Sequence, residues 1–204
     1  MLKYYAEFET DKYIRENFFQ DFSYIGIMVE IGAGPPDFIS MSKHFRDNGW
    51  RCICVDPNPK FVKQHEALGN EIYQRACSFE EKDSIFKIVD SNKLHGWNEF
   101  VDGVSISALE LRQDVKDLPI YEIPVKVIKL NSLLEYLNIE KIDFLSVDTE
   151  GWEIEVMMGF DVDKYQPKVV LLENFFHNNY YTEYMSERGY KLKHKIEYNY
   201  IFEK

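Results

Sequence analysis

Cysteine and positive charge are both scarce in this chain of 204 residues, and each scarcity excludes a class of protein. The three cysteines, Cys52, Cys54 and Cys77, are too few and odd in number for a disulfide framework, and no second pair completes a zinc site. We expect all three to be reduced residues of the core. Lys and Arg number 24 against 35 Asp and Glu, a net charge of -11 at pH 7. Nucleic acid and anionic membranes bind clustered positive charge, so we expect neither as a partner.

Long apolar runs are missing as well. No uncharged run approaches the ~18 residues of a membrane-spanning helix, and the first residues lead into charged sequence rather than an apolar signal region. The sequence therefore predicts a soluble, cytoplasmic protein. Its length favours one domain over residues 1–204, with one substantial core. Neither length nor charge indicates an oligomeric state.

Two glycines, Gly32 and Gly34, follow the short apolar strand 29–31 and carry the first chemical signal. Glycine is needed where a strand turns sharply into a helix while its backbone passes close to a ligand. The next strand, 51–55, ends in Asp56, about 20 residues further on, where nucleotide-binding βαβ units place the carboxylate that binds the ribose hydroxyls. The pattern predicts a nucleotide pocket. Its alternative is a structural glycine turn and a solvated acid at a strand end.

Hydrophobic periodicity predicts the other elements. Residues 1–26 form an N-terminal helical cap, with a helix near 11–20. Further helices are expected from Pro35 to Asn48 and near 60–68, 133–137, 152–159 and 181–188. Strands are expected near 71–76, 125–128, 142–148 and 168–172, and the tail forms a closing hairpin. Residues 84–127 form a strand insertion, with strands over 85–89 and 104–107, that either covers the pocket mouth or is an ordinary hairpin.

Acidic residues recur where the predicted buried strands end. Asp148 and Glu150 follow one such strand, and Glu173 and His177 follow the next. The carboxyl ends of parallel strands meet at one edge of the sheet, so we expect these side chains in one region. Glu150 or His177 is then a candidate base for a hydroxyl. Alternatively, Asp148, Glu150 and Glu173 hold Mg²⁺, or Glu150 only satisfies a helix N-terminus.

The third predicted strand, near 71–76, places Cys77 and Ser78 at its carboxyl end. In a doubly wound sheet that end lies beside the end of the second strand. Cys77 and Ser78 are therefore candidates for contact with the base of the same nucleotide.

Four segments together resemble a known family. They are Glu30-Ile31-Gly32-Ala33-Gly34, Val55-Asp56-Pro57-Asn58-Pro59, Asn131-Ser132-Leu133, and the run Ile142-Asp143-Phe144-Leu145-Ser146-Val147-Asp148-Thr149-Glu150-Gly151 followed by Gly159-Phe160-Asp161. These segments resemble the FkbM family of S-adenosylmethionine-dependent methyltransferases over most of residues 4–174. The Asp-x-Glu-Gly block after a buried strand is the most specific part of the likeness.

The resemblance implies an α/β, Rossmann-like class I methyltransferase sheet of seven strands, mostly parallel with an antiparallel C-terminal hairpin. It also implies S-adenosylmethionine across the strand ends and O-methylation of a hydroxyl on a small molecule or glycan, such as a sugar or secondary metabolite. Asp148, Glu150 and His177 are the candidate catalytic residues. The candidate cofactor-binding residues are Glu30, Gly32, Ala33, Gly34, Asp56, Pro57, Cys77, Ser78 and Asp148.

Two other functions compete with this one. An NAD-dependent oxidoreductase or epimerase would use Asp56 equally well for an adenosine ribose, but the chain lacks the third glycine of G-x-G-x-x-G. A catalytically inactive ligand-binding module with the same fold is the other, since strand-end acids can simply be solvated.

Overall fold

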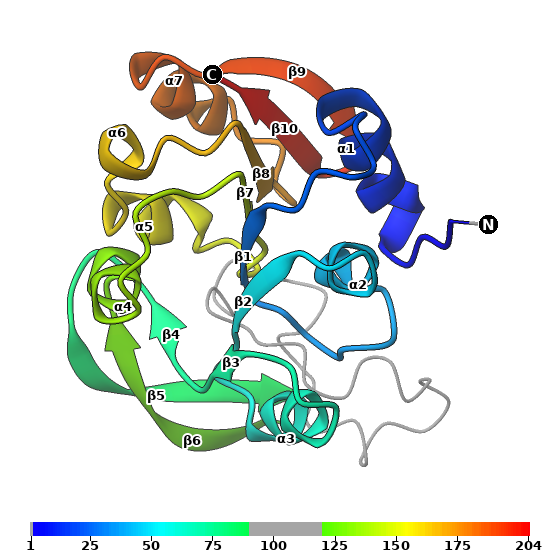
Figure 1. Ribbon diagram of the computed structural model, residues 1–204. Coiled ribbons are helices and arrows are strands. Elements are labelled where there is room, and N and C mark those ends of the chain that lie inside the picture. The colour runs from blue at the N-terminus through cyan, green and yellow to red at the C-terminus, as the bar shows by residue number, and fades with distance from the viewer. Residues whose placement is uncertain (1, 90–119) are drawn as a thin grey trace.

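The computed structural model describes residues 2–89 and 120–204, and its centre is a seven-stranded sheet in the order β3-β2-β1-β7-β8-β10-β9 (Figure 1). The strands are β1 (Ile27–Ile31), β2 (Arg51–Val55), β3 (Ile72–Tyr73), β7 (Phe144–Val147), β8 (Val169–Glu173), β9 (Lys191–Ile196) and β10 (Asn199–Glu203). The first five in spatial order are parallel, and β10 runs antiparallel to both of its neighbours. The predicted fold class is therefore confirmed.

Helices cover both faces of this sheet. The 3₁₀ helix η1 (Glu7–Glu9) leads into α1 (Thr10–Phe18), which packs with α2 (Met41–Asp47) on one face, while the other face carries α4 (Leu130–Tyr136), α5 (Glu153–Met158), α6 (Val162–Tyr165) and α7 (Tyr180–Glu187). Successive residues of a strand point to opposite faces, so Met28 joins the core under α1 and α2 whereas Val29 joins the core on the other side. The predicted apolar strands are thus buried on both sides.

A smaller sheet, in the order β4-β6-β5, lies beside the main one and consists of β4 (Ala76–Cys77), β5 (Lys82–Val89) and β6 (Ile120–Ile128). The strand expected over 85–89 lies within β5, and the one expected over 104–107 lies outside the described residues. The single strand expected over 71–76 is wrong. Arg75 N donates to the carbonyl oxygen of Tyr73 at 2.9 Å, a tight turn that ends β3, and β4 then pairs with β6 instead.

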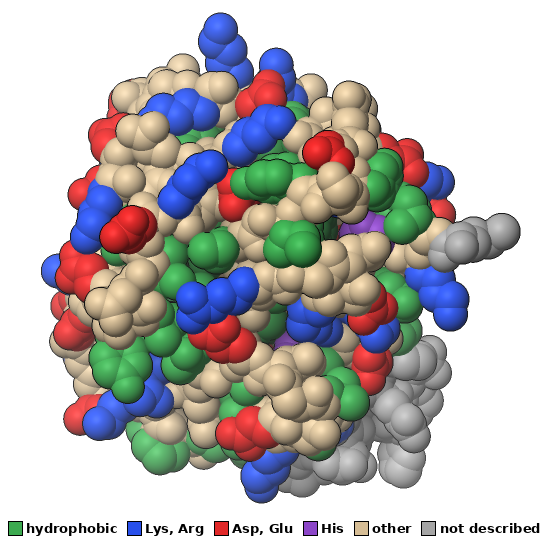
Figure 2. All heavy atoms as spheres, viewed as in Figure 1, with side chains coloured by type: hydrophobic (Ala, Val, Ile, Leu, Met, Phe, Trp, Pro, Cys, Tyr) green, Lys and Arg blue, Asp and Glu red, His purple; other side chains and the backbone are tan. Residues whose placement is uncertain are grey.

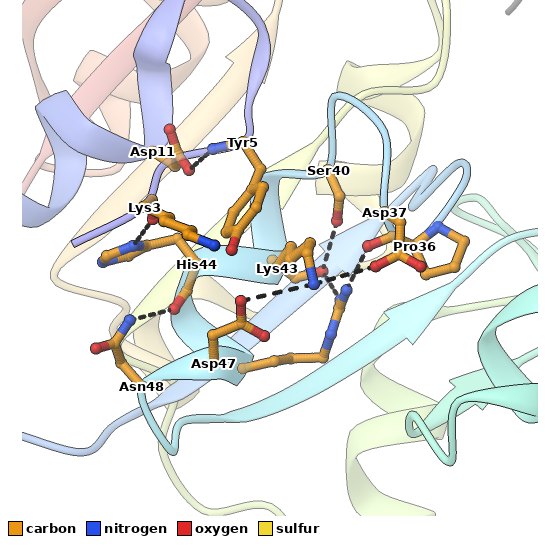
Figure 3. A network of polar contacts seen from close by, with 12 residues as sticks. Lys3, Tyr5, Asp11, Pro36, Asp37, Ser40, Lys43, His44, Asp47 and Asn48 are labelled. Carbon is orange, nitrogen blue, oxygen red and sulfur yellow. Dashed lines mark hydrogen bonds and ion pairs between the residues drawn. The ribbon is translucent and has the colours of Figure 1, made fainter. Parts of the chain in front are cut away.

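The helix expected from Pro35 begins later, because α2 starts only at Met41. α3 (Pro59–Ala67), by contrast, begins as predicted, with the Asn58 side chain accepting a hydrogen bond from Lys60 N. Residues 35–40 are irregular and are held by side chains of α2. Arg46 Nη2 donates to the Pro36 carbonyl oxygen at 2.7 Å, and Lys43 Nζ lies 3.1 Å from an Asp37 carboxylate oxygen (Figure 3).

The turn after β1 depends on Gly32. Its φ is +79°, and a Cβ built there would lie 1.7 Å from the carbonyl oxygen of Asp148. The neighbouring bonds hold the three strand ends together, since Gly32 N donates to the Val55 oxygen and Asp148 N donates to the Ile31 oxygen, both at 2.9 Å. Gly34 also has a positive φ, +58°, but a Cβ there would meet nothing within 4 Å.

These two glycines make a matched pair of tests. Gly34→Ala introduces no clash, and its only cost is the strain of an alanine in the left-handed backbone conformation. We therefore expect it to lower the free energy of unfolding by about 1 kcal/mol. Gly32→Ala must also push β7 away from β1, and a loss of at least about 3 kcal/mol is expected. Urea denaturation of both variants measures the difference. Equal losses would show that the contact with Asp148 does not constrain the fold.

Candidate functional site

A pocket opens at the carboxyl ends of β1, β7 and β8, where α/β sheets bind ligands. Its lining includes Glu30 and Asp148 from the strands and Gly34 from the glycine turn. The N-terminal segment and the turn before β10 complete it, joined by a 2.6 Å hydrogen bond from the Tyr198 hydroxyl to a Glu7 carboxylate oxygen. The volume is about 110 Å³, so the pocket encloses one end of a nucleotide-sized ligand rather than all of it.

Glu30, the acid inside β1, is buried and lies in the pocket wall. Cys54 Sγ donates to its Oε2 at 3.7 Å. Burial raises the pKa of Glu30 to about 7, and Ser42 and Arg46 partly oppose that shift. Asp148 reaches solvent through the pocket but is otherwise surrounded by protein, which also raises its pKa. The pocket wall is therefore acidic, with Glu7 as its third carboxyl group.

Asp56 connects the glycine turn to the end of β2. Its Oδ2 accepts from Gly34 N at 2.9 Å and its Oδ1 accepts from Asn58 N at 2.7 Å. Each carboxylate oxygen has a second lone pair that could accept a hydroxyl, but neither Asp56 nor Pro57 lines the pocket. The side chain is 2% exposed, and burial raises its pKa to about 6. Pro57, the next residue, is also buried.

Asp148, Glu150 and Glu173 come together as the sequence predicts. One carboxylate oxygen from each lies within 4.8 Å of the others. His177 is not part of this group. It is exposed in the segment after β8, with its Nδ1 3.4 Å from the Tyr200 hydroxyl. The structure therefore places His177 against β10. Asp148, which lines the pocket, and Glu150, which lies beside it in the cluster, remain the candidate bases.

Glu153 is a residue that sequence reasoning missed. It is fully buried, and its Oε1 accepts from Thr149 N at 2.8 Å and from Gly151 N at 3.1 Å. Its Oε2 accepts from the Tyr181 hydroxyl at 2.6 Å. The carboxylate thus fixes the loop that carries Glu150. The sequence did contain a signal for this role, since Glu153 is an acid at the start of a predicted helix, and such acids accept hydrogen bonds from free N–H groups.

Cys77 and Ser78, predicted to contact the base, do not line the pocket. Cys77 is buried in the core under α4 to α7. Ser78 Oγ accepts from Trp152 Nε1 at 3.1 Å, and its carbonyl oxygen lies against Gly159. Because β3 ends at Tyr73, Cys77 lies in the smaller sheet and Ser78 follows it, outside the main sheet. Ser78 contacts the residues at the start and end of α5. Ala33, in contrast, is in the pocket wall.

Three comparisons with known proteins bear on this site. The family model of the methyltransferase FkbM domain matches residues 30–192, which include the glycine turn, Asp56 and the acidic cluster. No curated protein and no solved structure matches the chain. Among the described residues, no helix is long and apolar enough to cross a membrane.

Asp56 gives the stability of the ligand-free protein a defined pH dependence. Its pKa is raised from 3.8 to about 6 on folding, so the folded chain binds the proton more tightly and stability is lost as pH rises through that window. At about 1.4 kcal/mol per pKa unit, the loss is about 3 kcal/mol. Relative to wild type, Asp56→Asn should therefore gain about that amount between pH 4 and pH 8, measured by urea denaturation.

The matched control is Asp163→Asn, since the Asp163 side chain is 82% exposed. It removes one exposed carboxyl group, and its stability difference from wild type over the same pH range is the background for the comparison. A pH dependence of Asp56→Asn no larger than this background would show that the Asp56 carboxyl group is not desolvated in the folded chain.

Proposed function

This chain belongs to the FkbM methyltransferase domain family, and we propose that it transfers a methyl group from S-adenosylmethionine to a hydroxyl group of a small molecule or glycan. The observation that carries the proposal is the bond between Gly34 N and Asp56 Oδ2. It joins the glycine turn, against which we propose the cofactor lies, to the acid that would hold its ribose. The two halves of a nucleotide site are thus one hydrogen-bonded unit.

The residues present fit this cofactor. Gly34 leaves open space where a side chain would stand, so a ligand can lie against its backbone. Glu30 and Asp148 supply negative charge for a cofactor with a positive sulfur and a positive amine. Asp56 would hold the ribose hydroxyls, and the pocket near Glu30 would hold the methionine end. When bound, S-adenosylmethionine supplies a methyl group on a positively charged sulfur.

The chain's own contribution is to position the acceptor and to accept its proton. Asp148 lines the pocket at the end of β7, so it can orient a hydroxyl toward the cofactor's methyl group. Asp148 or Glu150 can then accept the proton that the hydroxyl must lose. The bond between Tyr198 and Glu7 joins the N-terminal segment to the turn before β10 at one side of the pocket.

A small or glycan acceptor suits the charge of the protein better than a nucleic acid. The net charge is -11, and on the face seen in Figure 2 basic side chains are interspersed with acidic ones rather than gathered in a stripe. A phosphate backbone needs clustered Lys and Arg. We therefore propose that neither nucleic acid nor an anionic membrane is the partner.

Calorimetric titration with S-adenosylmethionine tests the cofactor. The Asp56 carboxylate would accept two charge-assisted hydrogen bonds from the ribose, so Asp56→Ala should weaken binding at least ~10-fold. Asp163→Ala, which removes an exposed acid, should bind as wild type does. Binding of NAD in place of S-adenosylmethionine would favour the oxidoreductase, and unchanged affinity in Asp56→Ala would remove that residue from the site.

Turnover tests the acidic residues separately. With a hydroxyl acceptor identified by screening sugars and secondary metabolites, Asp148→Asn should lower turnover roughly 10²-fold through lost alignment and proton acceptance. Release of S-adenosylhomocysteine is the measurement, with circular dichroism to confirm folding. If Asp148→Asn and Glu150→Gln both keep wild-type turnover, the chemistry lies elsewhere.

A further inference from the structure

We propose that Asp148, Glu150 and Glu173 bind one divalent cation, Mg²⁺ or Mn²⁺, at the end of the pocket where the acceptor would lie. The existence of this site depends only on the three carboxylates. Its role in catalysis rests on the proposed methyl transfer.

The geometry of the three side chains suits a hard cation. Their nearest oxygens lie within 4.8 Å of one another. Ligand oxygens about 2.0–2.6 Å from a hard cation lie at most ~5 Å apart, so a single ion can contact all three with small side-chain movements. The cluster offers only carboxylate oxygens, which favour Mg²⁺ or Mn²⁺ over metals that prefer nitrogen or sulfur.

Glu173 supplies a second and independent observation. It is 6% exposed at the end of β8, and its Oε2 is buried without a hydrogen-bond partner among the described residues. The charged side chains that act most strongly on it are all acids: Asp148, to which it is also hydrogen-bonded, Glu150 and Glu153. Buried carboxyl groups in proteins are protonated, are paired with positive charge or coordinate a metal. A cation between Glu173 and Asp148 would satisfy that requirement.

The scaffold around the cluster is already rigid. Glu153 holds Thr149 N and Gly151 N, which fixes the backbone on both sides of Glu150, and Asp148 N is bound to the Ile31 oxygen. Because the backbone that carries these ligands is already fixed, metal binding costs less conformational entropy. Asp148 is open to solvent, which leaves coordination positions for water and for an acceptor.

Such a cation would have a defined role beside the pocket, because Asp148 belongs both to the cluster and to the pocket wall. A divalent ion lowers the pKa of a hydroxyl next to it and fixes its orientation. The acceptor's proton would then leave more readily to a carboxylate or to water. The acidic wall would thus serve two positive ligands, the cofactor and the ion.

Manganese binding to the apo protein tests the site directly. Chelator-treated protein is titrated with Mn²⁺, and the free ion is measured by electron paramagnetic resonance. We expect one ion per chain, displaced by Mg²⁺, with affinity at least ~10-fold weaker in Glu173→Gln and in Asp148→Asn. Asp163→Asn is the charge-matched control and should bind as wild type does.

Urea denaturation shows whether weaker Mn²⁺ binding by Glu173→Gln comes from a lost ligand or from a folding defect. Without cation, Glu173→Gln should be at least as stable as wild type, because it removes a buried charge that lacks a partner. Added Mg²⁺ should raise the urea midpoint of wild type and not that of the variant. Lack of Mn²⁺ uptake by folded wild type, or equal uptake by Glu173→Gln, would overturn the proposal.

Titration of S-adenosylmethionine in the presence of chelator separates this inference from the proposed function. Cofactor binding by a protein that takes up no Mn²⁺ would refute the cation site alone. Mn²⁺ uptake by a protein that does not bind the cofactor would support the cation site and refute the proposed methyl donor.

Discussion

The contact between Gly32 and the carbonyl oxygen of Asp148 is the constraint on which the site depends. It lets the turn after β1 lie directly against the end of β7, at a separation where no side chain fits. The same close approach puts Glu30, on β1, and Asp148, after β7, in the wall of one pocket. Since β7 and β8 are paired in parallel, Glu173 is then brought to the same edge. This backbone contact and the parallel pairing of β1, β7 and β8 thus set the spacing of the acidic residues together.

The buried acids near this edge differ in their hydrogen bonds. We use this difference to separate acids with a structural role from acids that bind a ligand. Asp56 accepts from two backbone N–H groups, and Glu153 accepts from two backbone N–H groups and the Tyr181 hydroxyl. Both have hydrogen bonds that offset burial. Glu173 has an oxygen with no such partner in the described part of the chain. Burial and the neighbouring acids raise the pKa of Glu173, so it either holds a proton next to Asp148 or binds a positive ligand there.

The sequence predicted the sheet well because buried parallel strands give strong, nearly continuous apolar runs, as in β7 and β8. The sequence-based prediction was wrong where a local turn determines where a strand ends or a helix begins. Arg75 bonding back to Tyr73 divides the third strand, and side chains of α2 replace the helical bonds expected after Pro35. The acidic cluster followed from strand ends alone, whereas His177 did not join it. Its backbone has φ +50°, and its ring turns to Tyr200, which periodicity does not encode.

Acidity at the pocket connects stability to ligand binding. Burial raises the pKa of Glu30 and Asp148, so their charged forms are disfavoured in the empty protein. Anything positive that binds beside them removes part of that penalty and stabilises the folded chain. If the cofactor is S-adenosylmethionine, as we propose, its neutral thioether product lacks the positive sulfur and would relieve the penalty less. The acidic pocket wall would therefore bind the positively charged methyl donor more tightly than its neutral product. This difference in affinity would help the product to leave.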